Sequence, residues 1–427
     1  MTMIQEETMK LQGYHLHLVP TKKYKTITVV VKFKGILERE QITKRVLLPY
    51  ILRKGTANYP TEKLFQEKLN QLYGAVLSID GAKKGNQHIL SFRLEFANQK
   101  YIADEASILD EAIRLLHEVI FSPSLEGEAF KQKTVEREKE SLKQRIASIA
   151  DDKMAYANQR LIDEMCENER FSIHSSGYME DLEDIDAENM YAYYQSVIQE
   201  KMDIYVVGDI QKEAIVHSIR TSFDRENTLI ATQAITPEEH TTSEVKEVIE
   251  KQDVQQAKLH IGYRTHTTYQ SEDYFALQVF NGIFGGFPSS KLFINVREKN
   301  SLAYYASSRV ESHKGLLFVI SGIAPADYQK AREIIELQLQ MMQSGDFTEN
   351  DVEETKEQLI NQILETLDHT QGIVEMLYQE VIGERDLPPH ALIEGIKAVT
   401  REDIIQVANK IKQDTVYLLT DKGEVND

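Results

Sequence analysis

Cysteine and tryptophan are nearly absent from this chain of 427 residues, which has one cysteine and no tryptophan. The single cysteine, Cys166, excludes an internal disulfide and any zinc site built from several cysteines. Nothing in the surrounding sequence predicts an activated thiol, so we expect Cys166 to be an inert residue of a helix. We therefore expect no chemistry based on thiols.

Long apolar runs and an excess of basic charge are also missing. No run of about 18 apolar residues occurs, which predicts no membrane-spanning helix. Residues 1–20 lack the apolar core of a signal peptide. Lysine and arginine total 49 against 68 aspartates and glutamates, which gives a net charge of −19. Because a nucleic-acid-binding protein needs a basic surface to displace phosphate counterions, we expect no nucleic-acid binding. The lack of a signal peptide and of a membrane span predicts a cytoplasmic protein.

The chain is longer than one hydrophobic core usually supports, so two or more domains are expected. Residues 226–246 are rich in threonine and glutamate and lack apolar periodicity, which is typical of a linker. This stretch separates a predicted N-terminal domain, residues 1–225, from a predicted C-terminal domain, residues 247–427.

Both predicted domains mix strands with helices. Apolar residues at helical spacing predict helices, and alternating β-branched and aromatic residues predict strands. The predicted strands are 14–19, 26–34, 75–82, 88–96, 202–209 and 257–263, and the predicted helices are 41–52, 61–72, 106–120, 130–159, 186–200 and 212–223. Thr61 and Asp186 are predicted N-caps. This pattern indicates an α+β fold in which each domain has an antiparallel or mixed β-sheet covered by α-helices.

The two halves repeat the order of their elements, which indicates duplication. In the first half Gly55 precedes a helix start at Pro60–Phe65, and in the second half Gly285 and Gly286 precede one at Pro288–Phe293. A strand follows in both halves. We therefore expect two homologous domains.

Four segments together resemble the pitrilysin/insulinase (inverzincin) superfamily of zinc peptidases, and in size its mitochondrial-processing-peptidase-like branch. They are ILRKGT ending at Thr56, GYMEDLEDIDAENMYAYY from Gly177 with the IYVVGDI strand after it, LHIGYRT from Leu259, and NGIFGGFPSSKLFINVREKNSLAYYASS from Asn281. The last segment matches a specific family pattern nearly throughout, with Ser301 where glycine is usual. The resemblance implies two homologous α+β halves that close on each other like a clamshell.

The resemblance also implies that this chain has lost its metal site. Active members carry His-x-x-Glu-His on the helix that ILRKGT ends; the histidines hold zinc, and the glutamate is the general base for the attacking water. Counted back from Thr56, those positions hold Val46, Pro49 and Tyr50. Valine has no lone pair, proline cannot accept a proton, and tyrosine is rarely a zinc ligand. Proline in a helix interior also costs roughly 3 kcal/mol. We expect a catalytically degenerate member that binds no metal.

The third zinc ligand of the family is a distant glutamate. The best match to the pattern around it places Arg145 at that position, and a cation there would repel a metal ion. Other registers would bring in Glu136, Glu138 or Glu140. One glutamate alone would not hold zinc.

Two histidine patterns lie outside this motif. His15 and His17 are two residues apart on a predicted strand and share one of its faces, which is more typical of a polar strand surface than of a metal pair. His117 and Glu118 lack the second histidine of a zinc motif and are typical of the flank of an amphipathic helix.

Arg297 and Tyr304, in the run VREKNSLAY, are the candidate substrate-binding residues. In two-chain members of the family, a chain with a degenerate first half carries such an Arg and Tyr in its second half, where they hold the substrate backbone. Arginine offers a fork of N–H donors and tyrosine a single O–H. The residues alone favour a structural interpretation, in which Arg297 pairs with Glu298 or Glu311 and Tyr304 is half-buried on a strand.

Three functional hypotheses follow. In the first, the chain is a non-catalytic subunit of a two-chain zinc peptidase; it binds peptide substrate and completes the active site of a homologous partner that carries the zinc. In the second, it is a structural, scaffold or peptide-binding protein with no role in proteolysis. In the third, it is a homodimer that forms a peptide-binding or chaperone-like chamber.

Overall fold

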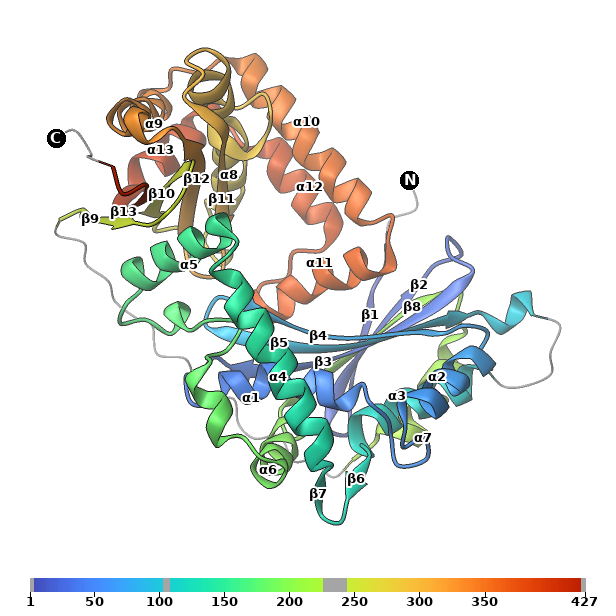
Figure 1. The fold of residues 1–427 in the computed structure, drawn as a ribbon. Coiled ribbons are helices and arrows are strands. Elements are labelled where there is room, and N and C mark those ends of the chain that lie inside the picture. The colour runs from blue at the N-terminus through green and yellow to red at the C-terminus, as the bar shows by residue number, and fades with distance from the viewer. Residues whose placement is uncertain (1–3, 103–107, 226–243, 424–427) are drawn as a thin grey trace. The chain divides into compact units, whose positions relative to one another are not determined.

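A computed structural model describes residues 4–102, 108–225 and 244–423 of the chain (Figure 1). Its strands are Glu7–Leu11 (β1), Tyr14–Pro20 (β2), Thr26–Ile36 (β3), Val76–Lys84 (β4), Gln87–Ala97 (β5), Leu125–Glu126 (β6), Ala129–Phe130 (β7), Lys201–Gly208 (β8), Lys246–Lys251 (β9), Ala257–Arg264 (β10), Ala303–Glu311 (β11), Leu316–Ile323 (β12) and Lys412–Thr420 (β13). Its α-helices are Ile42–Leu52 (α1), Glu62–Gln71 (α2), Ile108–Phe121 (α3), Gln132–Ile149 (α4), Lys153–Met165 (α5), Ala187–Val197 (α6), Lys212–Phe223 (α7), Tyr274–Asn281 (α8), Tyr328–Ser344 (α9), Glu349–Thr366 (α10), Thr370–Gly383 (α11), Pro389–Ala398 (α12) and Arg401–Lys410 (α13).

The chain packs into two compact units. The first contains the described residues within 1–147, 173–236 and 370–374, and the second contains those within 148–172, 237–369 and 375–427. The predicted domain limits at 225 and 247 stay a prediction, because most of the predicted linker lies outside the described residues. The packing differs from that prediction at residues 148–172, which pack with the second unit.

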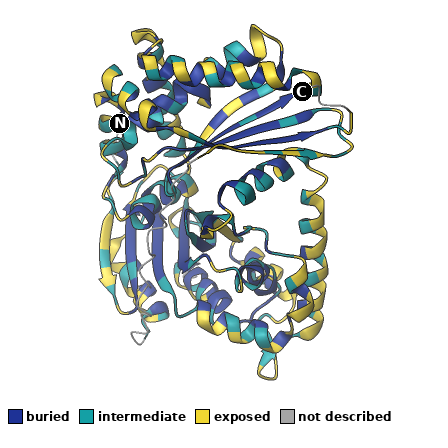
Figure 2. Ribbon diagram, turned by 90° about the vertical axis from the view of Figure 1, so that its left-hand side faces the viewer, coloured by how far each residue is buried: buried dark blue, intermediate teal, exposed yellow. Residues whose placement is uncertain are grey.

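The first unit is built on a six-stranded sheet in the order β1-β2-β8-β3-β5-β4. The sheet is mixed, because β8 runs parallel to β2 and antiparallel to β3. Alternate residues of β3, namely Val29, Val31 and Phe33, enter a core that also holds Leu116 and Ile120 of α3. Figure 2 shows the strands largely in the colour of buried residues and the outward helix faces in that of exposed ones.

The second unit has a five-stranded sheet, β11-β12-β10-β13-β9, in which β9 runs parallel to β13. Both faces of this sheet are buried. Leu317 and Val319 of β12 belong to the core with α8, α9 and α13, whereas Leu316 and Phe318 of the same strand belong to a core with α5. The predicted α+β class, with sheets covered by helices, is confirmed in both units.

Helix α5 approaches the sheet of the second unit closely at a glycine. Met165 is the last residue of α5. A Cβ atom added to Gly262 of β10 would come within 2.5 Å of its sulfur atom. The buried ion pairs of Glu169 with Arg264 (2.7 Å) and Lys314 (2.6 Å) hold the segment that follows the helix. Residues 148–172 are thus fixed to the second unit by packing and by charge.

The prediction of one helix over residues 130–159 was wrong. Helix α4 ends at Ile149 and α5 begins at Lys153, because the Asp152 side chain accepts hydrogen bonds from the N–H groups of Met154 and Ala155 and caps a new helix. The predicted N-caps Thr61 and Asp186 are confirmed; each accepts a bond from a backbone N–H of the first turn of its helix.

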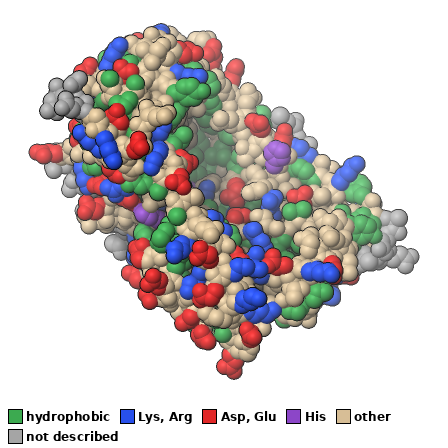
Figure 3. Space-filling view, viewed as in Figure 1, with side chains coloured by type: hydrophobic (Ala, Val, Ile, Leu, Met, Phe, Trp, Pro, Cys, Tyr) green, Lys and Arg blue, Asp and Glu red, His purple; other side chains and the backbone are tan. Residues whose placement is uncertain are grey.

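The surface mixes charges of both signs. Figure 3 shows acidic and basic side chains interspersed over one face of the molecule. Within the described residues, no helix is both long and apolar enough to cross a bilayer.

We expect His260 to make the stability of the protein depend on pH. It lies on β10 with no exposed surface, and burial, with Lys258 and Arg309 nearby, lowers its pKa from 6.5 to about 3. The unfolded chain therefore binds this proton first, and the free energy of unfolding falls as the pH drops below about 6.5. At about 1.4 kcal/mol per pH unit, this loss amounts to roughly 2 kcal/mol between pH 7 and pH 5.

Urea unfolding of a His260→Leu variant at both pH values measures this loss. The variant should lose less stability than the unchanged protein over this interval, whereas His217→Leu, at an exposed position on α7, should not alter the difference. Equal losses in the His260→Leu variant and the unchanged protein would show that this histidine does not contribute.

Candidate functional site

Helix α1 carries the three positions that hold the zinc motif in the resembled family. It continues through Pro49, whose carbonyl accepts a hydrogen bond from the Arg53 N–H at 3.2 Å. Pro49 is buried, and Val46 and Tyr50 are half-buried. The helix therefore tolerates the proline, and none of the three side chains offers a good zinc ligand.

Arg145 of α4 lies against Tyr50. Its guanidinium carbon is 3.8 Å from the centroid of the Tyr50 ring, which is a close cation–π contact. The structure thus brings together two of the positions that the family resemblance assigns to zinc ligands. A positive charge and an aromatic face lie there in place of carboxylate and imidazole.

The glutamates of the alternative registers are engaged elsewhere. Glu138 is buried and pairs with Lys54 at 3.3 Å and with Arg137 at 3.0 Å. Glu136 pairs with Lys139 at 3.3 Å, and Glu140 accepts a bond from Gln144. In the described part of the chain, no three His, Cys, Asp or Glu side chains gather in a group that could hold a metal ion. The residues present do not fit zinc.

Arg45, next to the first motif position, fixes α1 to the rest of the unit. Its side chain is 3% exposed and makes a bidentate ion pair with Glu200, at 2.6 and 2.8 Å. Its Nε donates to His88 Nδ1 at 3.0 Å, and Nη2 donates to the His88 carbonyl at 2.9 Å. Gly35 leaves room for this pair, since an added Cβ would come within 2.8 Å of the Arg45 guanidinium and 2.7 Å of Glu200.

These contacts shift the pKa of both bases. Burial alone would lower the pKa of Arg45, but Glu200 outweighs it and holds the pKa above its usual value. Burial and the Arg45 charge lower the pKa of His88 to about 3, so its imidazole is neutral and Nδ1 accepts the bond from Arg45. Sequence reasoning missed this network; its only sign in the sequence is a charged residue within the apolar run of the helix.

Glu118, which we expected on the flank of an amphipathic helix, lies on helix α3 and is a buried anchor. Its Oε1 accepts bonds from the Thr56 hydroxyl at 2.6 Å and from the Asn58 N–H at 2.9 Å. It therefore holds the loop that follows ILRKGT, and the side chain of Arg53 in that segment donates to the carbonyl of Ile79 on edge strand β4 at 2.8 Å.

His15 and His17 pair with carboxylates. His17 Nδ1 is 2.6 Å from Glu6, and its Nε2 is 3.3 Å from the buried Asp203, which also lies 3.4 Å from His15. Burial would lower the pKa of His17, but the hydrogen bonds to Asp203 and Glu6 raise it. The two histidines thus tie β2 to β8 and to the residue before β1.

Arg297 and Tyr304 of the second unit both reach solvent. Arg297 is exposed, on a π-helical turn, with its guanidinium 4.5 Å from the Phe293 ring centroid. It forms no ion pair with Glu298 or Glu311. Tyr304 is 78% exposed, at a bulge near the start of edge strand β11. The structural interpretation, with a paired Arg297 and a half-buried Tyr304, is therefore wrong.

The turn between Arg297 and Tyr304 contains Ser301, the position where the family pattern has glycine. Ser301 has a φ of +52°, in the left-handed region that favours glycine. Its N–H donates to the Arg297 carbonyl at 3.1 Å. The turn therefore adopts a backbone conformation that suits glycine better than serine.

Comparison with known proteins identifies relatives over the whole chain. The family model described as "Peptidase M16 inactive domain" matches residues 184–359. A Bacillus subtilis protein named "Probable inactive metalloprotease YmfF" is 46% identical over 422 residues, covering 98% of each chain.

Solved structures agree in fold. A conserved protein of Enterococcus faecalis V583 has a TM-score of 0.90 at 35% identity and covers 99% of both chains. A protease of Helicobacter pylori has a TM-score of 0.83 at 17% identity, covering 98% of this chain and all of that one.

We expect Arg45 to be structural, so that its loss lowers stability strongly. Replacing it by methionine leaves Glu200 in a partly buried place without its counter-ion, and breaking a buried ion pair costs about 3 kcal/mol or more. Urea unfolding followed by circular dichroism measures the difference. Arg220→Met is the matched control, because the Arg220 side chain is 58% exposed where that of Arg45 is buried, and an ion pair made by an exposed arginine is worth at most about 1 kcal/mol. Equal losses in the two variants would contradict the anchoring role of Arg45.

Proposed function

The chain belongs to the M16 family of peptidases, and we propose that it acts there as the non-catalytic subunit of a two-chain zinc peptidase. In this role it binds peptide substrate and completes the active site of a homologous partner. The partner supplies the zinc ion and the general base. We expect the pair to work in the cytoplasm.

The observation that carries this proposal is the replacement of the zinc site in the first unit. Active family members need two histidines and a glutamate on the helix that α1 represents. Here Val46 and Pro49 have no usable lone pair, and Tyr50 lies under the Arg145 guanidinium. Hydrolysis by a metal-bound water therefore has no support in this unit, although its fold is that of the family.

The second unit supports the substrate-binding half of the proposal. Arg297 and Tyr304 offer N–H and O–H donors to solvent, and neither is held by an ion pair. An extended peptide presents backbone carbonyls, which accept bonds from such donors. Arginine can bind two acceptors at once with its planar fork, so it suits this task better than lysine does.

Reconstitution with an active homologue tests the proposal. This chain is co-expressed with an M16 protein of the same genome that retains His-x-x-Glu-His, and peptide cleavage by the purified complex is measured with and without a chelator. We expect the two chains to co-purify and to cleave peptides only together. Because a hydrogen bond to a charged donor is worth about 1.5–3 kcal/mol, Arg297→Ala should lower kcat/KM about tenfold or more. Tyr304→Phe should lower it by less, since it removes one neutral bond.

Lys299→Ala is the matched control, because it removes an exposed positive charge two residues further along the same run. It should leave the cleavage rate unchanged. Full activity of the partner alone, or of the complex with Arg297→Ala, would contradict the assisting role. That result would favour a scaffold or peptide-binding protein with no part in proteolysis.

A further inference from the structure

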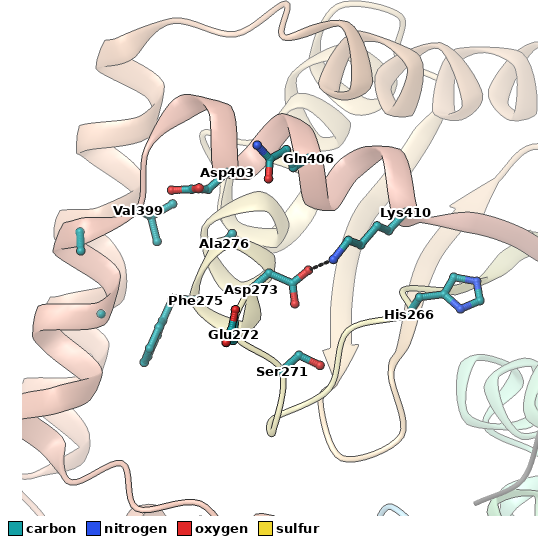
Figure 4. Close-up of a pocket in the computed structure, with 12 residues that line it drawn as sticks. His266, Ser271, Glu272, Asp273, Phe275, Ala276, Val399, Asp403, Gln406 and Lys410 are labelled. Carbon is teal, nitrogen blue, oxygen red and sulfur yellow. Dashed lines mark hydrogen bonds and ion pairs between the residues drawn. The ribbon is translucent and has the colours of Figure 1, made fainter.

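The second unit contains a cavity that neither the zinc positions nor Arg297 and Tyr304 explain. Its volume is about 620 Å³, and it lies between the loop before α8, the end of α12 and the length of α13. Figure 4 shows Asp403, Gln406 and Lys410 of α13 on one side, with Glu272, Asp273 and Phe275 facing them. This volume lies within the range of small-molecule sites, which runs from roughly 300 to 1,000 Å³.

The charges around the cavity do not balance. Three carboxylates, from Glu272, Asp273 and Asp403, line it together with one ammonium group, that of Lys410. Lys410 is already engaged by Asp273, at 2.6 Å, and Asp273 also accepts a bond from the Thr267 hydroxyl. Two negative charges, those of Glu272 and Asp403, therefore remain without a cation in the lining.

The acceptors of these two carboxylates are largely unused. Asp403 accepts bonds from the N–H and hydroxyl of Thr400 on its Oδ2 atom, at 2.8 and 2.7 Å, which leaves Oδ1 to a ligand. Glu272 is exposed and has no hydrogen bond or ion pair within the described residues. Both can therefore accept N–H bonds from a bound cation without breaking an existing contact.

The lining of the cavity also contains an aromatic side chain, that of Phe275. The Phe275 ring packs against α12 at Gly395, where an added Cβ would come within 2.4 Å of the ring. Arg385, 5.7 Å from the ring centroid, donates to the carbonyls of Tyr269 and Ser271, so its charge is engaged outside the cavity. An apolar ring in the lining beside these carboxylates suits a cation that carries an apolar stem.

We propose that this cavity binds an organic cation, a guanidinium or primary ammonium group on a short aliphatic body. The head group donates to Glu272 and to Asp403 Oδ1, and the stem lies against Phe275. A free amine and a basic side chain of a peptide share this chemistry. The site is independent of Arg297 and Tyr304, so its failure would leave the proposed subunit role untouched, and the reverse also holds.

Ligand-observed NMR titration of the full chain tests the site with three probes. Agmatine represents a free cation, Ac-Gly-Arg-Gly-NH₂ a peptide-borne one, and Ac-Gly-Glu-Gly-NH₂ is the anionic counterpart. We expect saturable binding of one or both cations, which weakens as salt is added, and none of the anion. Binding of agmatine alone would indicate a small-molecule site, and binding of the arginine peptide a side-chain site.

Glu272→Gln and Glu402→Gln form a matched pair of variants. Each removes one negative charge at an exposed position, but only Glu272 lines the cavity. Since an exposed ion pair contributes up to about 1 kcal/mol, Glu272→Gln should weaken cation binding about two- to fivefold, while Glu402→Gln should not change it. Equal effects of the two variants, equal binding of the anion, or no saturable binding of either cation up to about 10 mM would overturn the proposal.

Discussion

The buried ion pair between Arg45 and Glu200 holds helix α1 in place. The location of Val46, Pro49 and Tyr50 depends on this helix. Through the same guanidinium the helix is joined to His88 on β5 and is fixed over the sheet. This pair therefore fixes the helix that carries Val46 and Tyr50, the residues that the family resemblance assigns to zinc-ligand positions. All of these contacts are made by side chains and a backbone carbonyl of the first unit.

The positions that the family resemblance assigns to zinc ligands carry a different kind of interaction in this chain. Imidazole and carboxylate ligands would have to be deprotonated and held around an ion, whereas Tyr50 and Arg145 attract each other directly. Val46, one turn before Tyr50, packs against the hydrophobic core of the unit. The positions that the family resemblance assigns to zinc ligands are thus joined by a contact that needs no metal ion. Arg297 and Tyr304, the proposed donors to a peptide backbone, are exposed in the second unit.

Much of this was predictable from the sequence, and the failures have physical causes. Apolar periodicity and β-branched residues located most helices and strands of the first half of the chain, and Thr61 and Asp186 marked helix starts correctly because capping is a local interaction. The break at Asp152 was missed because charged residues continue on both sides of it. The contacts of Arg45 and Glu118 join residues far apart in the sequence, so no local pattern signals them. The exposure of Tyr304 was not predictable either, because the residue lies at a bulge in β11 that the sequence does not signal.

The zinc content of the purified chain tests most directly whether the first unit has lost its metal site. Elemental analysis after incubation with zinc and removal of the excess should find far less than one zinc ion per chain. A variant that combines Val46→His, Pro49→Glu, Tyr50→His and Arg145→Glu should instead hold about one ion, since it restores the ligand set of the family at these positions. One tightly held zinc ion in the unchanged chain, together with chelator-sensitive cleavage of peptides, would contradict a non-catalytic role.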